Sequence, residues 1–336
     1  MRAPPRARGE SADEEAAVKR RTGTPVSTSD ATANVGTATL PSGNDPHVFR
    51  HRTDRRGFLV TASASVGALL VGCRQQSLSA ASDSGASATA QLIGIQLYTV
   101  RDLLQNNFDH TLEQVAAIGY KEVELAGLHD KSPDKVRKTL DKLGLAAPST
   151  HIPYDRLRSN LQGVAEEARV LDHRYVICPW IDAAARRDAA AYRRIAADFN
   201  RFGESLQRLG LQFGYHNHDF EFAKLPGGEI GYDILLADCD PKLVKMELDL
   251  YWVTKAGSDP LAYFAKWPGR FPCVHVKDMT GNGAMTNVGQ GSIDWGRIFA
   301  KRREAGIEHF FVEHDNPKSP IEDIKASYSY MARLEL

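Results

Sequence analysis

The chain has 336 residues, with 42 basic and 42 acidic side chains and a pI near 7.2. A protein that binds nucleic acid through its phosphates usually carries a basic excess, so this balance argues against that class. The cysteines show neither CxxC pairing nor the spacing of a metal-binding motif. Length alone would allow two domains.

Residues 1–53 are rich in Ala, Thr, Ser, Pro and charged residues and have almost no periodic apolar positions. Such a composition buries too little surface to offset chain entropy, so we expect a disordered leader. The leader is longer than an export signal requires. We therefore expect that translation starts further downstream, near Val48.

Residues 54–73, "DRRGFLVTASASVGALLVGC", contain Arg55 and Arg56 before a short apolar run rich in small residues. The run is too short to span a bilayer stably and is typical of an export signal. The arginine pair resembles a twin-arginine signal, and the last four residues resemble a lipobox whose Cys73 is lipidated. A short buried helix is the alternative. We expect an exported periplasmic or cell-surface protein, anchored to the membrane only through this lipid, with residues 74–90 as a flexible tether.

Residues 91–336 have about the length of a single (β/α)8 TIM barrel, which is about 250 residues. Helical segments separate the apolar runs, and one of them begins with Ser132 as N-cap and ends at Gly144. This alternation predicts a parallel sheet closed into a barrel. An open doubly wound sheet is the alternative, but no glycine-rich loop follows the first run. The eight predicted strands are Leu92–Tyr98, Tyr120–Ala126, Leu145–Ile152, Arg174–Trp180, Leu211–His218, Leu243–Trp252, Pro272–Asp278 and His309–Asp315.

Polar side chains alternate with apolar ones near the ends of the later strands. In the sixth strand Glu247 and Asp249 share the face opposite the apolar residues. In the seventh, His275 and Lys277 do so, and in the eighth Glu313 does. Because the apolar face packs on helices, the polar face should point to the barrel axis, at the end where barrel active sites lie.

Four of these side chains form a candidate metal site. His216 lies near the end of the fifth strand, and Asp249, His275 and Glu313 lie near the ends of the next three. Two imidazoles and two carboxylates suit Mn, Co, Fe or Zn better than Mg or Ca. His218 shares the face of His216 and is the alternative ligand.

Further polar and aromatic residues should line the pocket. Glu313, His151 and His218 are the candidates to move a proton, because each could reach a substrate carbon or oxygen. Lys277 either binds a substrate oxyanion or pairs with a carboxylate. The substrate-binding candidates are Gln96, Tyr98, Glu124, Trp180, Trp252 and Lys277.

Several segments between Leu92 and Leu336 resemble the xylose-isomerase-like barrel superfamily of sugar isomerases and epimerases. They are "GIQLYTVRD", "VELAG", "THIPYD", "GYHNHDFEF", "ELDLYW", "VHVKDM", "VGQGSIDW" and "FFVEHD". The resemblance implies a divalent metal held by His216, Asp249, His275 and Glu313. The sequence departs from the pattern at His216, where epimerases of the superfamily usually have a glutamate, and "YHNH" is more similar to inosose dehydratases.

We therefore expect a metal-dependent sugar isomerase or epimerase that removes a proton next to a carbonyl. A lyase that eliminates across a keto-sugar, keto-glycoside or inosose is the alternative. An abasic-site endonuclease and a non-catalytic sugar-binding lipoprotein are remote ones. The expected partner is a small carbohydrate and not a nucleic acid. The loop "VGQGSIDW" (Val288–Trp295) could cradle a phosphate, but an exported enzyme rarely meets sugar phosphates, so we expect a shaping loop capped by Asp294.

Overall fold

The computed structural model describes residues 93–334. The predicted leader, the export signal with Cys73 and the tether lie outside the described residues. Between residues 93 and 334, no helix has both the length and the apolar character needed to cross a bilayer.

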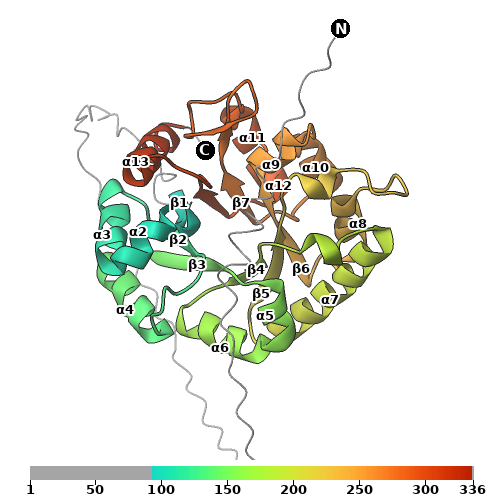
Figure 1. The fold of residues 1–336 in the computed structure, drawn as a ribbon, viewed down its shortest axis with the longest axis horizontal. Helices are drawn as coiled ribbons and strands as arrows, with labels where there is room; N and C mark the ends of the chain where they lie inside the picture. The colour runs from blue at the N-terminus through green and yellow to red at the C-terminus, as the bar shows by residue number, and fades with distance from the viewer. Residues whose placement is uncertain (1–92, 335–336) are drawn as a thin grey trace, which may run out of the picture. The chain divides into compact units, whose positions relative to one another are not determined.

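Eight parallel strands close into a barrel, with the helices outside it (Figure 1). Each strand pairs with its neighbours in the sequence, and the last one, β10, closes the barrel against β1. The predicted (β/α)8 barrel is thus confirmed. The barrel strands are β1 (Ile93–Gln96), β2 (Glu122–Leu125), β3 (Ala146–His151), β4 (Tyr175–Cys178), β5 (Gln212–His216), β6 (Val244–Asp249), β7 (Cys273–Val276) and β10 (His309–Val312).

The helices follow the strands in alternation. They are α2 (Arg101–Asn106), α3 (Phe108–Ile118), α4 (Pro133–Leu143), α5 (Tyr154–Ser159), α6 (Leu161–Val170), α7 (Ala189–Gln207), α8 (Gly231–Asp238), α9 (Leu250–Lys255), α10 (Pro260–Lys266), α11 (Trp295–Phe299), α12 (Arg302–Ala305) and α13 (Pro320–Met331). Three short 3₁₀ turns are η2 (Leu97–Val100), η3 (Ala183–Ala185) and η4 (Phe220–Phe222).

Local signals set the helix ends as expected. The Ser132 side chain accepts a hydrogen bond from the Lys135 backbone at the start of α4, and Gly144 ends the helix in the left-handed conformation, with φ 65°. The sixth predicted strand was too long at its C-terminal end. Asp249 caps α9 through a 2.8 Å hydrogen bond from the Trp252 backbone, so the apolar run from Leu250 continues as a helix.

The barrel interior has an apolar layer and a polar layer. Tyr175, Ile177, Cys273 and Phe311 form a small buried cluster of their own inside the barrel. The polar side chains of the site come later on the strands, as His275 follows Cys273, and a separate polar pair, Glu122 with His309, lies at the N-terminal end. The outer faces of the strands join the main core beneath the helices. This order leaves the polar layer at the C-terminal mouth of the barrel.

A hairpin that the sequence did not predict follows β7. It pairs β8 (Asp278–Met279) with β9 (Met285–Thr286), and the "VGQGSIDW" loop comes next. The Asp278 carboxylate accepts hydrogen bonds from this loop and its surroundings. The donors are the backbone N–H groups of Met279, Gly289, Gly291 and Ile293 and the indole N–H of Trp295, at 2.8–3.2 Å. These donors are therefore used by the protein's own carboxylate, and Asp294 caps α11 as expected.

Candidate metal centre

The predicted ligands come from four neighbouring strands; three of them converge at the barrel mouth, and His216 lies next to them. Asp249 Oδ2, His275 Nδ1 and Glu313 Oε2 face one another, with 3.9 Å between Asp249 and His275 and 2.5 Å between His275 and Glu313. His216 Nε2 lies 3.8 Å from Asp249 Oδ2. The other oxygen of Asp249, Oδ1, caps α9 and so fixes the side chain, which leaves Oδ2 directed at both imidazoles. We call these four residues the mouth group.

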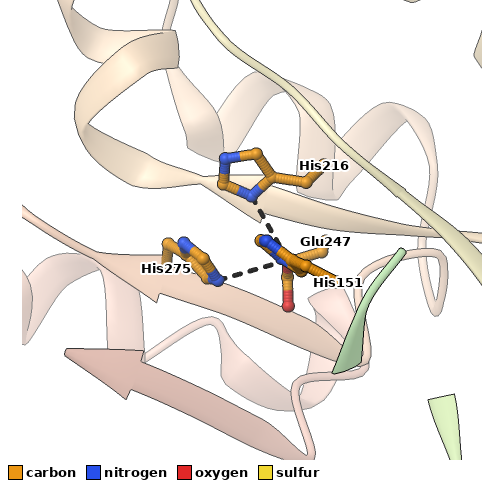
Figure 2. Close-up of side chains that lie close together, drawn as sticks. All are labelled: His151, His216, Glu247 and His275. Carbon is orange, nitrogen blue, oxygen red and sulfur yellow. Dashed lines mark hydrogen bonds and ion pairs between the residues drawn. The ribbon is translucent and has the colours of Figure 1, made fainter. Parts of the chain in front are cut away.

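A second set of side chains surrounds Glu247 (Figure 2). Glu247 Oε2 is 2.7 Å from His151 Nε2 and 3.2 Å from both His216 Nδ1 and His275 Nε2. Figure 2 shows the three imidazoles gathered around this one carboxylate. We call His151, His216, Glu247 and His275 the inner group. His216 and His275 belong to both groups, through opposite ring nitrogens.

The surroundings shift the pKa values of these imidazoles in different directions. Burial alone would lower the pKa of His151, but Glu124 and Glu247 outweigh it and raise the pKa to about 9. Burial alone would also lower the pKa of His275, but Glu247 and Glu313 outweigh it and raise this pKa well above its usual range. His216 behaves in the opposite way, because burial and then the charge of His275 lower its pKa well below normal.

Lys277 is almost fully buried beside the mouth group. Its ammonium lies 3.0 Å from Asp249 Oδ2, 2.9 Å from Glu313 Oε2 and 2.7 Å from Asp315 Oδ1. Burial would raise the pKa of Glu313, but Lys277 and then His275 hold it well below its usual range. Of the two roles expected for Lys277, the contacts match carboxylate pairing.

Gln96 and Glu124 form the wall opposite, and both side chains are completely buried. The Gln96 amide donates to Glu124 at 2.7 Å and accepts from the Tyr98 backbone at 2.9 Å. Glu124 also accepts from Ser149 and contacts His275 at 2.7 Å. Gln96 is therefore held by Glu124, and Glu124 in turn contacts the predicted ligand His275. Tyr98 is half-buried, and the guanidinium of Arg101 lies 4.0 Å from its ring centre.

His218 sits in an aromatic surround. Its ring centre lies 4.8 Å from that of Trp180 and 5.5 Å from that of Trp252, the two predicted pocket walls. The His218 backbone N–H donates to Glu221 at 2.8 Å, and the buried Glu221 also accepts from Tyr215. This aromatic surround contrasts with the two carboxylates, Glu247 and Asp249, that lie next to His216.

The donor chemistry fits a divalent cation. Among the described residues, the buried atoms His216 Nδ1, Glu247 Oε1 and Asp249 Oδ2 have no hydrogen-bond partner of suitable geometry. Among the described residues, the interior of the barrel mouth gathers five carboxylates, more than Lys277 and the two imidazoles with raised pKa values, His151 and His275, can neutralise. Buried charges of one sign need pairing or a metal. A mixed nitrogen and oxygen set suits Mn, Fe, Co or Zn. The carboxylates are Glu124, Glu247, Asp249, Glu313 and Asp315.

Glu247 was not among the predicted site residues. It shares the inward face of its strand with Asp249, and that alternation is the sequence signal that marks it. Strand pairing, which no local pattern reveals, sets Glu247 beside His216 across β5 and β6. Glu221 was also missed, because it lies on η4, outside any strand pattern.

A family model described as the xylose isomerase-like TIM barrel matches residues 112–334, so the chain belongs to this family. An inosose dehydratase from Lacticaseibacillus casei is 23% identical over 266 residues, which are 67% of this chain and 88% of that protein. A sugar phosphate isomerase/epimerase from Parabacteroides distasonis is 25% identical, with a TM-score of 0.66 over 75% of this chain and 98% of its own. The structure of the IolI protein with a bound zinc atom shares the fold, at 15% identity and a TM-score of 0.60, over 73% of this chain and 98% of its own.

Proposed function

We propose that this protein is a metal-dependent enzyme that removes a proton from the carbon next to the carbonyl of a sugar or keto-sugar, and returns it to give an isomer or epimer. The convergence of the mouth group at the C-terminal end of the barrel carries this proposal. Two structural neighbours support it: one is described as a sugar phosphate isomerase/epimerase, and the other, the IolI protein, has a bound zinc atom.

The chain's own side chains suggest the division of labour. His216, Asp249, His275 and Glu313 would hold the metal, which when bound supplies a Lewis acid for the substrate carbonyl and the neighbouring hydroxyl. Glu313 is the proposed base, in a state where its carboxylate has swung off the metal, and His151 or His218 is the alternative base. His151 and His218 are the candidates to hold or return the proton.

The substrate would enter beside aromatic walls. Trp180 and Trp252 flank His218, and such rings offer apolar faces to the C–H groups of a sugar. On the opposite wall of the pocket, the proposed substrate-binding residues are Gln96, Glu124 and Tyr98.

Elimination is the second candidate reaction. The curated relatives are inosose dehydratases. In addition, His216 stands where the epimerases that this sequence resembles have a glutamate, so a symmetrical pair of carboxylates is missing. Loss of a β-hydroxyl or glycosidic oxygen shares its first step, the proton removal, with isomerisation.

The test uses the full-length chain, stripped of metal and reloaded separately with Mn, Co, Fe or Zn. It is incubated with a panel of keto-sugars in deuterated water and followed by NMR. Deuterium at the carbon next to the carbonyl with an isomeric product would support the isomerase. An olefinic product would favour the lyase, and no exchange with any loaded form would refute both.

Asp249→Asn should abolish metal binding and exchange. Asp259→Asn is the matched control, because Asp259 caps α10 as Asp249 caps α9 but is exposed and lies outside the mouth group. Full activity in metal-free Asp249→Asn would contradict the proposed chemistry.

We also propose that the chain is exported by the twin-arginine route and anchored through a lipid on Cys73. Growth with an alkyne-tagged fatty acid should label the wild-type chain and the Cys239→Ala variant but not Cys73→Ala. Labelling that survives in Cys73→Ala would overturn the anchor.

A further inference from the structure

We propose that Glu247 is a positioning residue that determines which ring nitrogens of His216 and His275 face the metal. The inference rests on the proposed metal centre. It assigns the inner group the task of orienting the mouth group.

Each of the two shared imidazoles lies between two carboxylate environments. His275 turns Nδ1 to Glu313 at 2.5 Å and Nε2 to Glu124 at 2.7 Å and Glu247 at 3.2 Å. His216 turns Nε2 towards Asp249, at 3.8 Å, and Nδ1 towards Glu247, at 3.2 Å. Glu247 is thus the carboxylate that lies behind both rings.

A neutral imidazole has one N–H donor and one lone pair. A carboxylate on one side holds the N–H there and leaves the lone pair on the other side, which raises the ring's basicity as a metal ligand. Glu247 would therefore direct the lone pairs of His216 Nε2 and His275 Nδ1 into the mouth group. Glu124 shares this task at His275, where it is the nearer carboxylate, but among the described residues Glu247 is the one carboxylate within ion-pair distance of His216 Nδ1.

The location of Glu247 fits an indirect role. Its side chain is completely buried, so a substrate at the mouth cannot reach it without rearrangement. It precedes Asp249 by two residues on the same face of β6, one level deeper in the barrel. A buried carboxylate is costly unless it is paired, and the imidazoles of the inner group provide the pairing.

The inner group itself could be mistaken for the ion site, because its ligand atoms lie within 4.8 Å of one another. An imidazole that binds an ion through each nitrogen must lose both ring protons, so His216 and His275 would serve one group at a time. The mouth group offers two carboxylates and lies where barrel active sites are built, so we assign the ion to it.

The first measurement is zinc affinity by calorimetry on full-length chains. Wild type should bind one ion, and Glu247→Gln should still bind it with about 10- to 100-fold weaker affinity, as expected when an outer partner of a ligand is lost. Glu122→Gln is the matched control, because Glu122 pairs with His309 at 2.8 Å in the same barrel, at the opposite end. It should bind as wild type does.

The second measurement uses ¹⁵N NMR of the histidine rings in zinc-loaded wild type, so it does not depend on a variant folding. We expect metal at His216 Nε2 and His275 Nδ1, with protons on the opposite nitrogens. In Glu247→Gln the His216 ring should show a mixture of tautomers.

The contrary outcomes are distinct. Unchanged affinity and tautomers in Glu247→Gln, or zinc at His216 Nδ1, would overturn the role of Glu247. Loss of zinc in Glu247→Gln with retention in Asp249→Asn would place the ion in the inner group and overturn it too. A wild-type chain that binds no ion would refute the proposed metal centre, and this inference with it.

Discussion

At the scale of single residues, Glu221 shows how burial alters chemistry next to the site. Burial raises its pKa from 4.5 to about 7, although hydrogen bonds and the charge of His218 oppose the rise. Such a shift corresponds to roughly 3 kcal/mol of folding free energy that depends on pH.

This shift predicts a pH dependence of stability. The folded chain binds the Glu221 proton more tightly than the unfolded chain. Its contribution is therefore fully present below about pH 4.5 and is lost as the pH rises through about 7. Urea unfolding of wild type and Glu221→Gln across this range should show a stability difference that changes by up to about 3 kcal/mol. Parallel curves for the two chains would contradict the assignment.

At the scale of elements, sequence signals predicted the ends of helices and strands correctly where those signals are local. The Ser132 cap and Gly144 stop depend on a few neighbouring residues, so they are readable without the fold. The end of β6 could not be predicted in this way, because the apolar run Leu250–Val253, which is buried here, would suit a buried strand as well as a buried helix. The capping bond of Asp249 decides for the helix.

The loop after β7 is held by the Asp278 carboxylate. Gly289, with φ 86°, and Gly291 let the backbone approach: a Cβ at Gly289 would collide with the Tyr330 ring, and one at Gly291 with Asp278 itself. A buried N–H group left without an acceptor costs about 1–3 kcal/mol.

Asp278→Asn should therefore destabilise the barrel by roughly 2–4 kcal/mol, since an amide nitrogen would face several N–H donors. It should also expose the loop to proteolysis. Asp294→Asn is the control, because Asn caps a helix about as well as Asp. Chemical denaturation and limited proteolysis measure both effects, and equal behaviour of the two variants would contradict this role of Asp278.

At the scale of the whole molecule, barrel closure brings together side chains that are far apart in the chain. The carboxylates of the interior repel one another, and a divalent cation should relieve this repulsion and stabilise the folded state. At a free metal concentration of about 100 times Kd, the gain is about 2.7 kcal/mol.

For a barrel of this size, that gain should raise the melting temperature by roughly 5–10 °C. Thermal scans of the metal-free chain with and without Mn or Zn measure the shift. Asp249→Asn should show none, whereas Asp259→Asn should match wild type. An equal shift in both variants would mean that metal binds elsewhere.

The sequence by itself determined the eight-strand alternation and the inward faces of the later strands, because both follow from a period of two along each strand. It also marked His216, Asp249, His275 and Glu313, which lie at readable strand ends. Only the tertiary structure decided that Lys277 pairs with three carboxylates and that Glu247 contacts both shared imidazoles. These contacts depend on the register between strands and on ring orientation, which are set when the barrel closes and not by any local pattern.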